Sequence, residues 1–278
     1  MIRGVIMVAL AAASWGTWSL FVRPTGQTGV VTSPIIMAVI AIAALPLALR
    51  EPRGRWDRTT LALLAAYTVG DVVNMVTFFT ALTVTTVAIA VITHYLAPIF
   101  IALAAPRIDG ARVRGTRVAT LVALAGLVIV LEPWRGVQGD VLLGAALGGA
   151  SAVAYAANVF TGRRLADRIG PASVMSYHAA LAAVLVLPFA VSGLATVSWH
   201  DVGLLAAGAS TIGALSGVAF VAGLQRIGAA RTAVLTYLEP LVAVAVGALV
   251  WDEPLRPVAA LGGALVLAAG IHVARQAR

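Results

Sequence analysis

Residues 81–98 read ALTVTTVAIAVITHYLAP, and residues 223–240 read GLQRIGAARTAVLTYLEP. Both segments end in Tyr-Leu-x-Pro, so that Tyr95 corresponds to Tyr237 and Pro98 to Pro240. A proline inside a helix removes a backbone hydrogen bond and bends the helix. Matched interruptions in two halves of a membrane protein predict a hinge or a binding site near the middle of the bilayer. The alternative is a pair of static kinks.

The composition of the whole chain is that of a membrane protein. Of its 278 residues, 61% are hydrophobic and only 11% are charged, and the mean hydropathy is +0.99. An ordinary soluble domain carries about 25% charged residues, so a soluble enzyme and a nucleic-acid-binding domain are excluded. The net charge is +8, and every basic residue is arginine. Because cysteine is absent, disulfides, thiol chemistry and Cys-ligated metals are excluded, and we expect no cofactor and no metal.

Hydrophobic runs divide the chain into ten segments of about 20 residues, the length that crosses a bilayer. The third and fourth runs are joined by almost nothing polar, but such a long apolar stretch cannot form one crossing, so we expect a break near Thr83. The predicted fold class is an all-α polytopic membrane protein with ten transmembrane helices. Their expected ranges are 3–22, 30–49, 59–80, 84–104, 115–132, 140–162, 172–192, 200–223, 228–251 and 255–274.

The arginines lie very unevenly on the two sides of these spans. This bias predicts that both termini are cytoplasmic and that the chain is a multi-pass protein of the plasma or inner membrane. The first segment also resembles a secretory signal, but its apolar run continues to Val22 and favours a transmembrane helix. The side of the termini carries Arg3, Arg50, Arg53, Arg55, Arg58, Arg107, Arg112, Arg114, Arg117, Arg163, Arg164, Arg168, Arg226, Arg231, Arg275 and Arg278, whereas the opposite side carries only Arg23, Arg135 and Arg256.

The second half of the chain repeats features of the first half. Leu63-Leu64-Ala65-Ala66 matches Leu204-Leu205-Ala206-Ala207, and Ser14 with Trp18 parallels Ser151 with Tyr155. With five spans per half, an odd number, the second copy enters the membrane from the opposite face. We therefore predict two inverted five-helix repeats, residues 1–136 and 137–278, an architecture that secondary transporters use for alternating access.

These features together resemble the EamA-type branch of the drug/metabolite transporter superfamily. The residues that carry the resemblance are the two Tyr-Leu-x-Pro segments, Trp251-Asp252-Glu253-Pro254-Leu255 and the Gly262-Gly263 helix. The resemblance implies a secondary transporter that exports a small organic metabolite, such as an amino acid or a related compound. Related branches move nucleotide sugars and sugar phosphates, and no segment assigns one substrate.

Three ionisable residues fall inside the predicted spans: Asp71, His94 and Glu239. Such a group costs roughly 2.5–3.5 kcal/mol near a helix centre, so it usually faces a cavity or a partner. Histidine titrates near neutral pH, and a desolvated carboxyl can be shifted into the same range. We expect these residues to bind substrate, a proton or both. The alternative is an interhelical hydrogen bond that only fixes packing.

Aromatic and amide side chains form the predicted substrate-binding set. Trp15 and Trp18 share a helix face, and so do Tyr155 and Asn158, whereas Asn74 lies one turn after Asp71. An interfacial aromatic belt, or a local polar network at Asn74, is the alternative. His178, near the end of its span, is expected to be a packing residue. The predicted set is Trp15, Trp18, Asn74, Tyr95, Tyr155, Asn158 and Tyr237, with Pro98 and Pro240 as hinges.

Signatures of other functions do not occur in the sequence. It has no HExxH, GxSxG or Walker A motif, and Asp71 is not in a GxGD context. We therefore do not expect an enzyme. An energy-independent facilitator, a lipid-linked flippase and a channel remain alternatives. The expected partners are a small-molecule substrate, the lipid bilayer and protons, without nucleic acid, and the chain is expected to be a monomer or a homodimer.

Overall fold

The computed structural model describes residues 1–110, 115–136, 139–253 and 256–275. Within these residues ten helical segments are long and apolar enough to cross a membrane, which confirms the predicted number. Arg112, Arg114, Pro254, Leu255 and Arg278, used in the sequence analysis, lie outside the described residues. The ten segments are Ile2–Thr25, Gly29–Ala48, Arg58–Val84, Val87–Ile108, Thr116–Arg135, Val141–Ile169, Pro171–Leu194, Trp199–Ile227, Ala229–Val250 and Pro257–Arg275.

Some segments are single helices and others are interrupted. The single helices are α3 (Gly29–Ala48), α4 (Arg58–Val84), α8 (Val141–Ile169), α9 (Pro171–Leu194) and α14 (Pro257–Arg275). The interrupted segments are α1–α2–η1 (Ile2–Trp15, Ser19–Val22, Arg23–Thr25), α5–α6 (Val87–His94, Ala97–Ile108), α7–η2 (Thr116–Leu131, Pro133–Arg135), α10–η3–α11 (Trp199–Gly208, Ala209–Leu215, Ser216–Ile227) and α12–α13 (Ala229–Leu235, Leu238–Val250). Of these pieces, η3 is π-helical.

Local sequence explains where the long helices begin and end. Asp57 accepts a hydrogen bond from the Thr60 backbone N–H at 2.9 Å and so caps α4. Between α4 and α5 the backbone is extended at Thr85 and Thr86, so the break expected near Thr83 occurs slightly later in the chain. Gly170, with φ 89°, separates α8 from α9 in a conformation that favours glycine.

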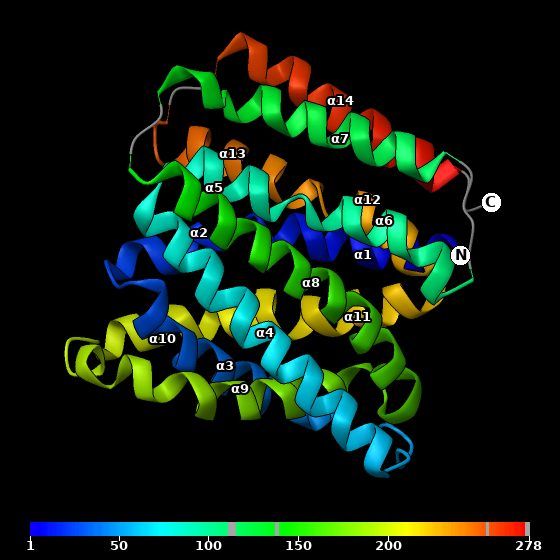
Figure 1. The fold of residues 1–278 in the computed structure, drawn as a ribbon. Coiled ribbons are helices and arrows are strands. Elements are labelled where there is room, and N and C mark those ends of the chain that lie inside the picture. Colours follow the sequence, from blue (N-terminus) through cyan, green and yellow to red (C-terminus); the bar gives the residue numbers. More distant parts are fainter. Residues whose placement is uncertain (111–114, 137–138, 254–255, 276–278) are drawn as a thin grey trace.

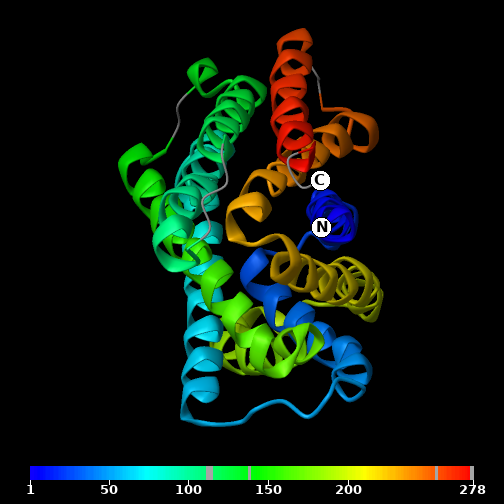
Figure 2. The same ribbon diagram turned by 90° about the vertical axis from the view of Figure 1, so that its right-hand side faces the viewer.

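The helices pack in pairs that join distant parts of the chain. α3 lies along α9, α4 along α8, α1 along α11 and α7 along α14, and α6 packs against α12. Seen from the end that holds the termini, α4, α5–α6, α7 and α8 form one side, and α1, α11, α12–α13 and α14 form the other (Figure 2). Helix α1 begins and α14 ends at the same end of the bundle (Figure 1).

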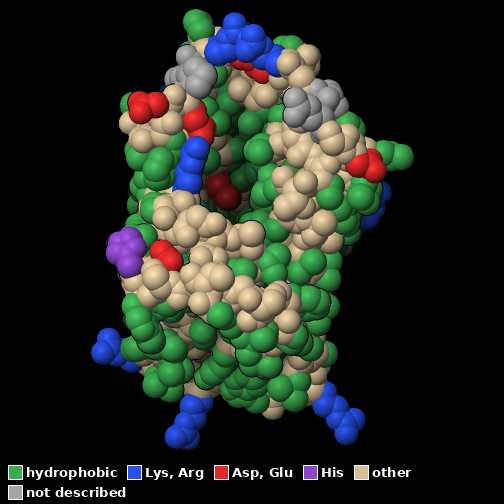
Figure 3. Space-filling model, turned by 90° about the vertical axis from the view of Figure 1, so that its left-hand side faces the viewer, with side chains coloured by type: hydrophobic (Ala, Val, Ile, Leu, Met, Phe, Trp, Pro, Cys, Tyr) green, Lys and Arg blue, Asp and Glu red, His purple; other side chains and the backbone are tan. Residues whose placement is uncertain are grey.

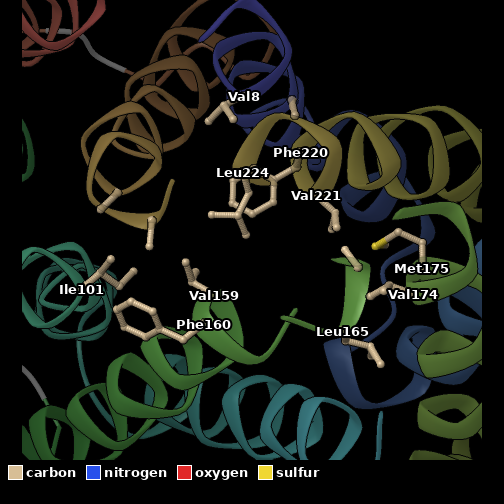
Figure 4. Packing of buried hydrophobic residues seen from close by; sticks show 14 of the residues in the cluster. Val8, Ile101, Val159, Phe160, Leu165, Val174, Met175, Phe220, Val221 and Leu224 are labelled. Carbon is tan, nitrogen blue, oxygen red and sulfur yellow. The ribbon is translucent and has the colours of Figure 1, made fainter. Parts of the chain in front are cut away.

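The core joins α1, α6, α8, α9 and α11 (Figure 4). It contains many alanines between larger side chains such as Val8, Ile101 and Leu165. On the outside, large apolar side chains are exposed; Leu142 and Leu249 are each 83% exposed. A protein with a small-residue interior and an apolar exterior is suited to a lipid environment, where close helix packing replaces the hydrophobic effect between helices.

Candidate substrate site

Two helix breaks meet in the interior of the bundle. One lies between His94 and Ala97, and the other lies between Leu235 and Leu238. Pro98 and Pro240 have no N–H for the carbonyl groups one helical turn earlier, which belong to His94 and Thr236, so an α-helix cannot continue normally there.

The two breaks are tied to each other by a hydrogen bond. The Tyr237 hydroxyl donates to the Tyr95 backbone carbonyl at 2.9 Å, and this bond is buried. The Tyr95 carbonyl needs such a donor, because the N–H of Ile99, its usual partner in a helix, donates instead to Leu96 at 2.9 Å. Tyr237 is fully buried and lies 5.7 Å from Tyr95 between ring centroids.

A small pocket lies against these breaks. Its volume of about 10 Å³ has room for about one water molecule. The pocket is lined by His94, Tyr95, Ala97, Pro98, Tyr155, Thr236 and Glu239.

The surface of the bundle is hollowed at the end opposite the termini. Acidic side-chain atoms lie deep in this hollow (Figure 3).

His94 is held by a hydrogen-bonded chain of three side chains. The Ser151 hydroxyl donates to Asn74 Oδ1 at 2.7 Å and lies 2.7 Å from His94 Nδ1. Because that hydroxyl proton is directed to Asn74, His94 Nδ1 must carry the proton in its bond to Ser151. In the neutral ring, Nε2 is then left with a free lone pair that can accept a proton or a solute N–H.

Aromatic rings surround His94. Its ring centroid lies 4.6 Å from that of Phe78, 5.2 Å from that of Tyr95 and 5.7 Å from that of Tyr155. These rings belong to α4, the α5–α6 break and α8. Asn74, His94, Tyr95 and Tyr155, four of the residues predicted for the site, therefore lie close together.

Among the residues that line the pocket, Glu239 supplies a carboxyl group and His94 an imidazole. Glu239 is half-buried, and its carboxylate interacts with the Tyr95 side chain. A carboxylate beside aromatic rings, with no arginine in the lining, is suited to bind an ammonium group.

Five of the seven predicted substrate-binding residues are not part of this lining. Asn74 is connected to it through Ser151 and His94, and the other four lie away from it. Trp15 donates its indole N–H to the Ile212 carbonyl of η3 at 3.1 Å, and Trp18 packs against Gly208 and Gly213. Asn158 is buried against Gly70. Tyr237 is outside the lining and donates its hydroxyl proton to the Tyr95 backbone carbonyl.

Asp71 is also outside the lining and faces α9. Its Oδ2 lies 3.6 Å from Nε2 of His178, a residue expected from the sequence to serve in packing. His178 is 3% exposed. The pair therefore joins the middle of α4 to α9.

Several residues of the site were missed by sequence reasoning. Thr236 and Ser151 carried a signal, because they are the repeat counterparts of His94 and Ser14. Phe78 is one apolar residue among many and carried none. Within the described part of the chain there is no group of three or more His, Cys, Asp or Glu side chains that could hold a metal ion.

At the end of the bundle that holds the termini, polar contacts join the two halves of the chain. Arg168 pairs with Asp57 at 2.5 Å, and Arg163 pairs with Asp109 at 2.7 Å. Glu51 accepts the backbone N–H groups of Ala172 and Ser173 at the start of α9, at 2.9 and 2.8 Å. The Thr60 backbone N–H, with help from Arg168, lowers the pKa of Asp57 to about 2.

Ten apolar helices, two of them broken beside a small polar pocket, define a multi-pass membrane protein, and broken helices beside a pocket are typical of secondary transporters. A solved crystal structure has the same fold, with a TM-score of 0.82 and 18% sequence identity over 96% of this chain and 94% of that one. An uncharacterized transporter of Archaeoglobus fulgidus is 28% identical over 273 residues, which are 98% of this chain and 96% of that protein.

A family model matches the second half of the chain. Residues 142–274 match the EamA-like transporter family. The second half of the chain thus carries an EamA-like transporter domain, and this match and the transporter relative support the transporter role that the resemblance implied.

Proposed function

We propose that this protein exports a small organic metabolite bearing an ammonium group, such as an amino acid, across the plasma or inner membrane by alternating access. The observation that carries the proposal is the meeting of two matched helix breaks beside His94 and Glu239. Broken helices at the middle of the membrane are the usual binding element of secondary transporters. The pocket holds about one water in this conformation, so a solute enters as the broken helices separate.

Alternating access requires two similar halves, which we assign to residues 1–136 and 137–278 in inverted orientation. The helix pairs support this assignment. If each span is replaced by its counterpart in the other half, five spans away, the α1–α11 pair becomes the α8–α4 pair. The same replacement turns the α3–α9 pair and the α7–α14 pair into themselves.

Two hydrogen bonds follow the same exchange. Ser14 donates to Ser216 at 2.7 Å, and Ser151 donates to Asn74 at 2.7 Å. Ser151 is the repeat counterpart of Ser14, and the offset that relates Tyr95 to Tyr237 relates Asn74 to Ser216. Equivalent hydrogen bonds therefore join the α1–α11 pair and the α4–α8 pair. This is expected if the two halves are related by approximate twofold symmetry.

The orientation is inferred from charge. The arginine bias places the termini in the cytoplasm. The hollow in Figure 3 then faces outward, and the contacts of Asp57, Glu51 and Asp109 close the cytoplasmic end. We interpret this conformation as the outward-facing one.

The test uses three solutes that differ in one group: leucine, its decarboxylated amine 3-methylbutylamine, and its deaminated acid 4-methylpentanoate. In proteoliposomes, with and without a proton gradient, we expect leucine and the amine to cross and the acid not to cross. Glu239→Gln should lower the uptake at least tenfold. Glu253→Gln, which removes a carboxylate outside the pocket, is the matched control and should lower it less than twofold.

Equal movement of the acid, or full activity of Glu239→Gln, would overturn the assignment of an ammonium-bearing solute. Uptake that is equal with and without the proton gradient would instead support an energy-independent facilitator. In that case His94 and Glu239 act in recognition alone.

A further inference from the structure

We infer that Asp71 and His178 form a proton-binding site that holds one proton between them, separate from the substrate pocket. Its role in coupling rests on the proposed transport function. The site is built from α4 in the first half of the chain and α9 in the second half.

The hydrogen bonds of His178 determine where its protons are. Nδ1 lies 2.8 Å from the Val174 backbone carbonyl, and a carbonyl can only accept, so Nδ1 carries a hydrogen. In the neutral ring Nε2 would then present a lone pair to Asp71 Oδ2, 3.6 Å away. Two acceptors facing each other repel, and a proton on either atom removes the repulsion. In the state that we infer, the pair holds one proton, as imidazolium with carboxylate or as imidazole with carboxylic acid.

The surroundings leave the pair without a competing charge. The Tyr67 ring meets the His178 ring edge-on at 4.8 Å, and Tyr155 of α8 lies within electrostatic reach of Asp71. Helix α3, which packs along α9, contains no ionisable side chain. His94, on α5, is bound to Ser151. The other charged groups of α8 and α11 bind elsewhere or are exposed at the helix ends: Arg163, Arg164, Asp167, Arg168 and Arg226.

Packing alone does not require an ionisable pair at this place. The offset that relates Tyr95 to Tyr237 relates Asp71 to Gly213, and a Cβ there would contact Ile40 of α3, an apolar side chain. The corresponding contact in the other half of the molecule is thus made without charge. The Asp71–His178 pair therefore occurs in only one of the two corresponding places. This is expected of residues that bind a proton and do not only fix the packing.

The pair is placed to link a proton to the movement of the halves. The Asp71 side chain is 23% exposed and the His178 side chain 4%, so the proton enters and leaves through Asp71. A bound proton attracts α4 to α9, and its loss leaves two facing acceptors that push them apart. Proton release therefore favours the rearrangement in which these two helices separate.

The first experiment needs no transported solute. The chain has only four histidines, so ¹⁵N-histidine labelling of the full chain in lipid nanodiscs, with assignment by single His→Gln variants, resolves each ring. We expect Asp71→Asn to move the pH at which the His178 signal changes by at least one unit, a tenfold change in proton affinity. His200, an exposed histidine 3.8 Å from Asp201, is the internal control and should not respond. An identical His178 titration in both proteins would overturn the inference.

The second experiment tests coupling. With any solute that the wild type moves faster under a proton gradient, we compare uptake with and without the gradient. In Asp71→Asn and in His178→Gln this ratio should fall to about one. If this ratio stayed at the wild-type value in both variants, the coupling role of the pair would be overturned. The transport proposal would not be affected, because it is tested separately by Glu239→Gln.

Discussion

At the scale of single residues, the hydroxyl of Tyr237 shows how a helix break is stabilised. Pro98 prevents a regular helix, and the Tyr95 carbonyl is left without its helical donor. In a bilayer there is no water to replace that donor, so another side chain must supply it. Tyr237, from the other half of the chain, does so.

Tyr237→Phe should destabilise the protein by about 1–3 kcal/mol, because a buried carbonyl loses its partner while the ring volume is kept. Thermal unfolding in detergent measures the effect. Tyr177→Phe is the control, because the Tyr177 hydroxyl makes no hydrogen bond among the described residues. Equal unfolding temperatures for the two variants would show that the Tyr95 carbonyl finds another donor.

At the scale of helices, glycines determine how closely the paired elements approach. Gly126 of α7 and Gly262 of α14 face each other: a Cβ added to Gly126 would lie 2.6 Å from the Gly262 carbonyl oxygen and 3.0 Å from Val266. Gly4 of α1 and Gly223 of α11 form a similar contact. Close backbone approach at small residues is the main source of helix association in lipid.

Gly126→Val should force α7 and α14 apart and lower the stability by about 1–3 kcal/mol through overpacking. Gly149→Val is the matched control, since a Cβ at Gly149 on α8 meets no atom within 4 Å. Both changes alter helix propensity alike. If Gly149→Val were as destabilising as Gly126→Val, the loss would come from the backbone and not from the α7–α14 contact.

At the scale of the whole molecule, the polar contacts at the end with the termini oppose opening on that side. Asp57 is both the cap of α4 and the partner of Arg168. Asparagine can still cap a helix but carries no charge. Asp57→Asn therefore removes the ion pair and retains the cap.

We expect Asp57→Asn to raise the fraction of molecules open at this end by roughly two- to fivefold, the range for an exposed ion pair. Spin labels at Arg53→Cys and Arg164→Cys, two exposed positions, report the distance across it. The absence of native cysteine makes the labels unique. Asp140→Asn is the control, because Asp140 caps α8 through Leu143 and forms no ion pair within the described ranges.

The pH dependence of this effect follows from the lowered pKa of Asp57, about 2 compared with the usual 3.8. A carboxyl with a lowered pKa stabilises the folded contact above its ordinary value and loses that contribution as the pH falls toward the lowered one. The difference between wild type and Asp57→Asn should be constant from pH 8 to 5 and vanish as the pH approaches 2. A difference that disappears between pH 7 and 6 would assign the closure to another group.

The ten spans and the class of protein could be predicted from the amino-acid sequence. The length of an apolar segment and the positions of prolines are local properties, so they can be recognised in the sequence without the fold. For example, the break expected near Thr83 lies at Thr85 and Thr86. The ionisable and aromatic residues at matched positions of the two repeats likewise predict a site at His94, Tyr95 and Glu239.

Which of these polar residues contact one another depends on the packing of the helices and could not be predicted from the sequence. Trp15 and Tyr155 carry the same kind of signal in sequence, yet Trp15 is used to bind the Ile212 carbonyl and Tyr155 lines the pocket. His178 looks like a packing residue until α9 is placed beside α4, where it meets Asp71. The physical reason is that each residue of a helix points about 100° around the axis from the one before it, so neighbours in sequence meet different partners. The direction of each face is set by the packing of all ten helices together, which no single segment encodes.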